Sequence, residues 1–219
     1  MYGLATAILV LIAGALTAYF WRARPSEPGR ISQISQWNKP MNRARLSPDG
    51  HAVAFDSPVR GITQVFLMLT SGGEPLQLTN DEGEKRVNTF SSDGKEIYYQ
   101  RSSGRDEVWA VPALGGSPRH VASAFLAVPS PDGASIFYLK SGASGIFRAG
   151  KSGLNEELVY NPKGIGLFFV PLILFPSGND LLAASWRRDS PNARIFRINL
   201  TTHAAVDLVR GGTRVYQMV

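Results

Sequence analysis

The stretch Ser47-Pro48-Asp49-Gly50 recurs along this chain of 219 residues and decides its fold. The later copies are Ser91-Ser92-Asp93-Gly94, Ser130-Pro131-Asp132-Gly133 and the altered Phe175-Pro176-Ser177-Gly178. Their glycines are 44, 39 and 45 residues apart. A period near forty residues is typical of repeat proteins, and a β-propeller blade of four strands needs about this length. The spacing therefore predicts an all-β repeat fold.

Hydrophobic positions keep a fixed distance from each copy of this phrase. Four and six residues past the Asp slot, they alternate as in a half-buried strand: Val53 and Phe55, Ile97 and Tyr99, Ile136 and Tyr138, Leu181 and Ala183. An aliphatic and an aromatic residue then mark a further strand: Val65-Phe66, Val108-Trp109, Ile146-Phe147 and Ile195-Phe196. Each unit thus reads as strand, SPDG turn, strand, loop, aromatic strand, glycine turn and strand. We predict blades at about residues 43–80, 87–122, 124–160 and 167–209.

The phrase itself has the chemistry of a tight turn. Proline presets φ near −65°, aspartate accepts hydrogen bonds from backbone donors just beyond it, and glycine adopts the left-handed corner. The alternative is a ring of acidic metal ligands at Asp49, Asp93 and Asp132. Equivalent turns of a propeller lie too far apart to share an ion, and the fourth copy lacks the carboxylate. We therefore interpret the phrase as a turn.

These motifs resemble the TolB-like, WD-type propeller repeat of bacteria. In the first unit the resemblance includes Val53-Ala54-Phe55, Gln64-Val65-Phe66 and the stretch from Gly72 to Thr79, and over the whole chain it covers roughly residues 31–219. It departs in the fourth unit, at Ser177 and Ala183. Such propellers also follow the membrane helix of bacterial serine/threonine kinases and winged-helix regulators, and they form the non-catalytic domain of prolyl-oligopeptidase-like enzymes. A shared fold does not settle function.

Two segments are left over after four units are counted. Residues 31–37 precede the first phrase as Leu76-Gln77-Leu78-Thr79 precedes the second, which predicts the outer strand of another blade. Residues 214–219 are predicted to be the inner strand of a fifth blade. An inner and an outer strand cannot pair directly, because two middle strands belong between them. We expect about four blades of a larger ring, from a truncated chain, with open sheet edges that invite pairing.

The N-terminus predicts a transmembrane helix over residues 2–21. Tyr2 to Trp21 carries no charge, and a helix of that length spans roughly 30 Å, the hydrocarbon thickness of a bilayer. A cleaved signal peptide is the alternative, but no basic segment precedes the apolar stretch and Leu16-Thr17-Ala18 is a poor cleavage site. Membrane lipid is therefore an expected partner of residues 2–21. Residues 22–30, rich in proline and polar residues, are expected to form a linker.

Two arguments predict opposite orientations of the helix in the membrane. Arg22, Arg24 and Arg30 follow the predicted helix, and the positive-inside rule then keeps the propeller in the cytoplasm. The resemblance implies the reverse, with an upstream domain inside and the propeller outside. We expect a single pass through the inner membrane with the propeller on the periplasmic, extracytoplasmic side.

Charge and composition argue against a nucleic-acid partner. The formal charge is +6, but residues 22–48 account for a net +5 and residues 49–219 for only +1. The excess is juxtamembrane, where it can meet anionic headgroups, and the propeller is close to neutral. The chain has no cysteine, which fits either compartment.

No catalytic motif occurs in the chain, so we predict that it is not an enzyme and assign no catalytic, cofactor or metal-binding residue. His51, His120 and His203 occupy different repeat phases, without the spacing of a zinc site. No G-x-S-x-G elbow, Walker loop or kinase signature is present. Phe66 and Trp109 could stack on a ligand, but an aromatic recurs there in every unit, so core packing is expected. We expect a membrane-anchored sensory or scaffold module that binds a protein or peptide through propeller loops, as part of a larger signalling protein. The alternative is the non-catalytic propeller of a prolyl-oligopeptidase-like hydrolase.

Overall fold

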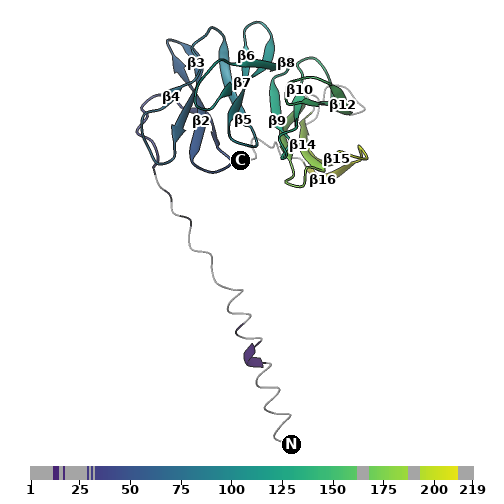
Figure 1. The fold of residues 1–219 in the computed structure, drawn as a ribbon. Helices are drawn as coiled ribbons and strands as arrows, with labels where there is room; N and C mark the ends of the chain where they lie inside the picture. The colour runs from purple at the N-terminus through teal and green to yellow at the C-terminus, as the bar shows by residue number, and fades with distance from the viewer. Residues whose placement is uncertain are drawn as a thin grey trace, which may run out of the picture. The chain divides into compact units, whose positions relative to one another are not determined.

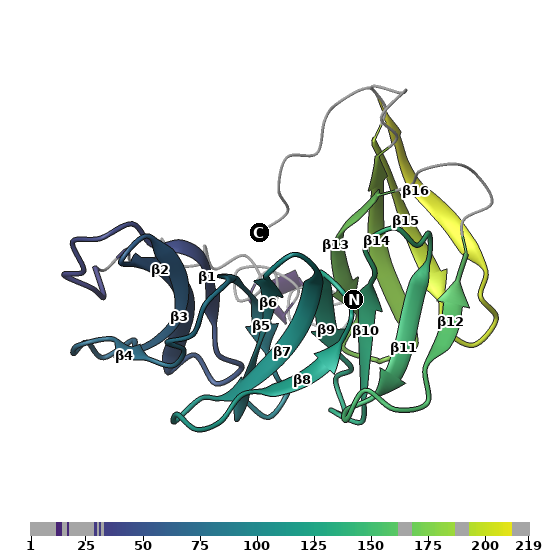
Figure 2. The same ribbon diagram turned by 90° about the horizontal axis from the view of Figure 1, so that it is seen from above.

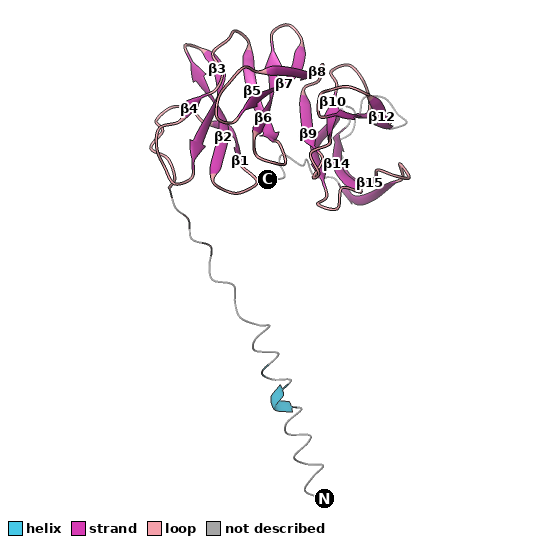
Figure 3. Cartoon of the chain, viewed as in Figure 1, coloured by secondary structure: helices cyan, strands magenta, loops and turns pink. Residues whose placement is uncertain are grey.

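The computed structural model describes residues 12–14, 17, 29, 31, 33–161, 168–186 and 193–211. The chain divides into two compact units, Met1–Gln33 and Ile34–Val219. The described residues of the second unit are strands and connecting loops, with sixteen strands and no helix (Figures 1 and 3).

The strands form four antiparallel sheets of four strands, each paired in sequence order. Blade 1 contains β1 (Asn42–Leu46), β2 (Ala52–Val59), β3 (Ile62–Leu69) and β4 (Leu76–Gln77). Blade 2 contains β5 (Glu84–Phe90), β6 (Glu96–Ser102), β7 (Asp106–Pro112) and β8 (Arg119–Ala122). Blade 3 contains β9 (Leu126–Pro129), β10 (Ser135–Leu139), β11 (Ile146–Gly150) and β12 (Glu157–Tyr160). Blade 4 contains β13 (Phe168–Leu174), β14 (Asp180–Trp186), β15 (Ala193–Asn199) and β16 (Ala205–Gly211). Four four-stranded antiparallel sheets confirm the prediction of an all-β fold built like part of a propeller.

The first strand of each blade lies on the inner side of the row of blades. Figure 2 shows β1, β5, β9 and β13 on this inner side, with β4, β8, β12 and β16 outermost. Each SPDG turn joins an inner strand to its neighbour, so these turns share one end of the blades. The β2–β3 hairpin and the link from β4 to β5 lie at the opposite end.

The turns are closed by their own side chains. In the second copy the Ser91 hydroxyl donates to Asp93 Oδ1 at 2.7 Å, and the Lys95 amide donates to the same oxygen at 3.2 Å. Gly94 has φ of 71°, the left-handed corner that the motif predicts. In the altered fourth copy the Asn179 amide donates to Ser177 Oγ at 3.4 Å, so a hydroxyl replaces the carboxylate as the acceptor. The turn interpretation is confirmed.

These turns predict a pH dependence of stability. The serine hydroxyl, and then a backbone amide, lower the pKa of Asp49, Asp93 and Asp132. At acidic pH the unfolded chain therefore binds more protons than the folded chain does. The stabilisation is complete above the ordinary aspartate pKa of about 4 and is lost as the pH drops through the lower folded values. We expect the free energy of unfolding by urea to decline on going from about pH 6 to about pH 3. Ser91→Ala should make the decline shallower, and an equally steep decline in this variant would contradict the mechanism.

Each boundary between blades has its own apolar core, because alternate residues of a strand face opposite sides of the sheet. Tyr99 packs with blade 1, in a cluster that includes Val65. Its neighbour Tyr98 packs with blade 3, in a cluster that includes Ile136. The boundary of blades 3 and 4 is filled around Leu181. The repeat positions Val53, Ile97, Ile136 and Leu181 are all buried.

The structure differs from expectation at residues 31–37. Ile31 and residues 33–37 do not form a strand. An irregular segment that includes Trp37 packs instead on the face of blade 1 around Phe55 and Phe66, with ring centroids 6.0 and 5.4 Å apart. In blades 2, 3 and 4 the equivalent face packs against the preceding blade. In blade 1 the indole of Trp37 provides this apolar contact instead.

The apolar run from Leu167 to Phe175 predicts a strand buried on both faces, and this prediction is wrong at Ile173. Leu172 is buried against blade 3, but the next residue, Ile173, is 41% exposed on the other face of the sheet. Among the described residues no further blade covers that second face. Burial on both sides requires a neighbour on both sides.

Several expectations lie outside the described residues. Residues 12–14 and 17 are helical, and Thr17 Oγ1 donates to the Ala13 carbonyl at 2.6 Å. Within the described ranges, no helix has the length and apolar character needed to cross a bilayer. Most of the predicted span 2–21, the linker 22–30 except Gly29, and all of 214–219 fall outside those ranges.

Candidate functional site

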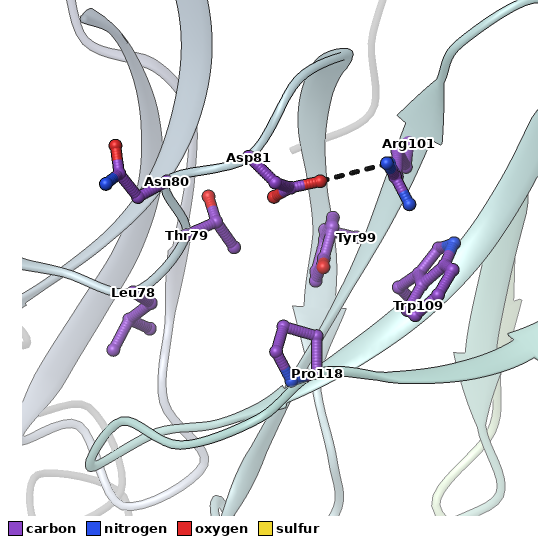
Figure 4. Close-up of a pocket in the computed structure, with 8 residues that line it drawn as sticks. All are labelled: Leu78, Thr79, Asn80, Asp81, Tyr99, Arg101, Trp109 and Pro118. Atoms are coloured by element: carbon purple, nitrogen blue, oxygen red, sulfur yellow. Dashed lines mark ion pairs between the residues drawn. The ribbon is translucent and has the colours of Figure 1, made fainter.

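A pocket of about 330 Å³ lies where the link between β4 and β5 meets the outer part of blade 2. Its lining comprises Leu78, Thr79, Asn80, Asp81, Tyr99, Arg101, Trp109 and Pro118 (Figure 4). The first four residues belong to the link, Tyr99 and Arg101 to β6, and Trp109 to β7. No sequence motif predicts this pocket, because its lining comes from segments that are separate in the sequence.

Hydrogen bonds to β3 hold the link in place. The Leu78 amide donates to the Val65 carbonyl at 2.8 Å, and the Val65 amide donates to Thr79 Oγ1 at 2.9 Å. The Thr79 hydroxyl in turn donates to Gln64 Oε1 at 2.7 Å. This hydroxyl thus both donates and accepts, and its two bonds fix the link against β3.

The carboxylate of Asp81 is the central charged group of the pocket. One carboxylate oxygen is 3.0 Å from Lys85 Nζ, and the other is 3.1 Å from Arg101 Nε, the ion pair drawn in Figure 4. Lys85 is fully buried, and its ammonium also donates to the carbonyls of Asp81 and Glu82. Buried charges are tolerated when paired and hydrogen-bonded in this way. Asp81 remains 44% exposed, so it is open to solvent and to a ligand.

Trp109 provides the aromatic surface of the pocket. The Arg101 guanidinium lies over its ring at 5.3 Å, a cation–π geometry, and the indole Nε1 donates to Glu107 Oε2 at 3.0 Å. The ring is half-buried, whereas Phe66 at the equivalent position of blade 1 is buried in the core. Core packing was expected for both residues, and it describes Phe66 fully and Trp109 only in part.

Tyr99 forms the buried side of the pocket. Burial raises the pKa of its phenol, and the negative charge of Asp81 raises it further. The hydroxyl therefore stays protonated at physiological pH and can act as a hydrogen-bond donor. The pocket combines an aromatic face, a fixed ion pair and a neutral phenol, which suits binding of a polar group with an apolar stem.

The histidines do not form a site. His51, His120 and His203 are all exposed and lie in different parts of the fold, and His120 packs edge-on against Trp109 with centroids 5.5 Å apart. In the described part of the chain, no cluster of three or more His, Cys, Asp or Glu side chains could hold a metal. Asp93 and Asp132 line a smaller cavity of about 240 Å³. Each of these two aspartates accepts hydrogen bonds within its own turn.

Comparisons with known proteins place this fold among propellers. No family model matches the chain. It is 34% identical over 101 residues to Tricorn protease homolog 1 of Streptomyces coelicolor, which is 44% of this chain but only 9% of that protein. A TolB structure from Agrobacterium tumefaciens superposes with a TM-score of 0.71 at 19% identity, over 86% of this chain and 71% of that one. TolB of Acinetobacter baumannii gives 0.62 at 15% identity, over 78% of this chain and 43% of that one. The chain thus spans less than a tenth of the Tricorn homologue, and the structural likeness establishes a TolB-like β-propeller fold.

Proposed function

We propose that this chain is a non-enzymatic binding module that captures a peptide segment of a protein partner in the pocket between blades 1 and 2. The observation that carries the proposal is the half-buried Trp109 ring beside the Asp81–Arg101 ion pair. A rigid aromatic surface next to fixed charges is typical of the residues that dominate protein interfaces. The TolB-like fold supports the proposal, since it offers loops held by rigid sheets.

The same proposal includes a membrane tether through residues 2–21 and a sensory role beside a kinase or regulatory domain. It rests on the uncharged N-terminal stretch and on the motif resemblance. Because the chain has no cysteine, Leu114→Cys at a 91% exposed site gives a single reactive thiol. Labelling of this thiol in intact cells by a membrane-impermeant maleimide supports an extracytoplasmic propeller, whereas labelling only after lysis contradicts it.

A peptide-display library panned on the full chain tests the binding proposal. For an enriched peptide, Trp109→Ala should weaken binding about 30-fold, the loss typical of an aromatic hot spot. Phe147→Ala is the matched control, because Phe147 is a half-buried aromatic at the equivalent position of blade 3. Equal affinity losses in the two variants, or no enrichment of any peptide, would refute the pocket as the binding site.

A second candidate is the propeller of a protease, in which the blades gate a catalytic domain. The identity to the Tricorn protease homologue favours it. The reading frame on both sides of this sequence distinguishes the two. A protease domain or an α/β-hydrolase with a G-x-S-x-G elbow favours gating, and a kinase or winged-helix domain favours the binding module.

A further inference from the structure

The inner strands of blades 1 and 2 both carry a β-bulge. In β1, Asn42 pairs with Asp56 and Arg45 with Ala54, so Arg43 and Ala44 together face one residue of β2. In β5, Val87 pairs with Tyr99 and Thr89 with Tyr98, so Asn88 is the extra residue. Arg43 has φ of 43°, a left-handed conformation that few non-glycine residues adopt. Bulges of this kind redirect side chains and occur often beside functional sites.

Hydrogen bonds join the two bulges across the blade boundary. Arg45 Nε donates to the Asn88 carbonyl at 3.0 Å, and the Val87 amide donates to Asp56 Oδ1 at 3.0 Å. Asp56 is almost fully buried, and its charge acts on Arg43, Arg86 and Arg45. The bulges and these charged groups therefore form one cluster on the inner strands.

Among the described residues, the three arginines of the cluster outnumber the two carboxylates that interact with them, Asp56 and Asp106. Five arginines elsewhere in the blades form ion pairs with carboxylates: Arg101, Arg119, Arg148, Arg194 and Arg197. Within the described residues Arg43, Arg45 and Arg86 form none, and all three are exposed. Desolvation lowers the pKa of the Arg43 guanidinium although the residue is largely exposed; the charge of Arg86 lowers this pKa further, and the charge of Asp56 raises it.

Asn88 adds an unused donor to the same cluster. Its side chain is only 6% exposed, and among the described residues its amide nitrogen Nδ2 has no hydrogen-bond partner. Buried hydrogen-bond donors without partners are rare in native proteins, and an unpaired one indicates that an acceptor binds there. The acceptor that suits this cluster is an anion, because guanidinium groups and an amide all donate.

We propose that Arg43, Arg86 and the Asn88 amide form an oxyanion-binding site on the inner strands of blades 1 and 2. The ligand group is a carboxylate or phosphate, whose oxygens match the planar donor geometry of guanidinium. The site is separate from the Trp109 pocket and stands whether or not that pocket binds peptides.

Titration of the full chain at low ionic strength tests the site, with inorganic phosphate and with triglutamate as separate probes. The readout is heat of binding together with the NMR signals of the arginine Nε–Hε groups. We expect saturable binding that shifts the Arg43 and Arg86 signals and weakens with salt. Tighter binding of triglutamate than of phosphate identifies peptide carboxylates as the source, and the reverse identifies a free phosphate. Absence of saturable binding of both probes overturns the proposal.

Two variants distinguish binding at a specific site from attraction of the anion to the general positive charge of the protein. Arg86→Gln should weaken binding roughly tenfold or more, since it removes a charge-assisted donor. Arg105→Gln, in the exposed hairpin between β6 and β7 of the same blade, makes the same charge change and should leave affinity within about twofold. Equal losses of affinity in the two variants would overturn the proposal of a specific site.

Asn88→Ala tests the amide. It should also lower affinity without lowering the urea midpoint, because the donor it removes has no partner in the described structure. A lower midpoint with unchanged affinity would mean that Asn88 serves the fold alone. Trp109→Ala should leave phosphate binding unchanged, so failure of the pocket and failure of this site are distinguishable.

Discussion

Replacing Gly153 with alanine is expected to lower the free energy of unfolding by about 2–5 kcal/mol. Gly153 lies in the turn between β11 and β12, with φ of 85°, and a Cβ there would overlap the backbone carbonyl oxygen of Val121 in β8. The left-handed conformation costs an alanine roughly 1–2 kcal/mol, and displacing packed backbone adds about 1–3 kcal/mol. Backbone atoms cannot rotate away as a side chain can, so blades 2 and 3 must move apart.

Gly142→Ala is the matched control. Gly142 has φ of 77°, in the loop between β10 and β11, but no atom lies within 4 Å of the position of its added Cβ. This variant should lose only the conformational part, about 1–2 kcal/mol. Urea unfolding followed by circular dichroism measures both variants. Equal losses would show that the turn of blade 3 does not approach blade 2 closely.

The second large effect is expected from Phe55→Ala, at about 3–5 kcal/mol. Phe55 is fully buried, stacked on Phe66 with centroids 5.5 Å apart and covered by Trp37. Removing the ring leaves a cavity between a sheet and the Trp37 segment, and deletion of a buried aromatic side chain is among the costliest core changes. Folded domains have a total stability of about 5–15 kcal/mol, so this loss would be large.

Leu114→Ala is the control for Phe55→Ala, because Leu114 is 91% exposed and its truncation should change stability by less than about 0.5 kcal/mol. Tryptophan fluorescence provides a second readout, since the Trp37 ring packs on Phe55, and a Trp37→Phe background separates its signal from that of the other three tryptophans. A Phe55→Ala loss below about 1 kcal/mol would mean that the Trp37 segment collapses into the gap and that the face is only loosely packed.

The repeated blades could be predicted from the sequence because the SPDG turn is a local feature. Ser91, Asp93 and Gly94 satisfy one another within a few residues, so the pattern is visible without knowledge of neighbours. The strands that follow have period-two alternation, and Ile97 and Tyr99 accordingly share the face toward blade 1. The strand predicted over residues 31–37 is wrong because an outer strand needs a partner strand, and the described residues provide none for it.

The candidate sites were harder to predict because they depend on distant groups. Lys85 could have been placed inside, since it alternates with buried Val87, but nothing in the sequence pairs it with Asp81. Asn88 would alternate to the outside in a regular strand, and the bulge in β5 reverses that expectation. Trp109 occupies a recurrent aromatic position, and because Phe66 at the equivalent position is buried, the repeat pattern alone does not predict the partial exposure of Trp109.

The self-contained turns also bear on how such an array can grow. Since Ser130 and Asp132 close their corner without help from another blade, a genetic crossover between two copies of the motif leaves every hydrogen bond of the corner intact. A crossover in the link after β4 would instead separate Thr79 from Gln64. We therefore expect duplication and exchange of blades to be tolerated at the rim formed by the SPDG turns, and to be more disruptive at the opposite rim, where a crossover separates bonded side chains.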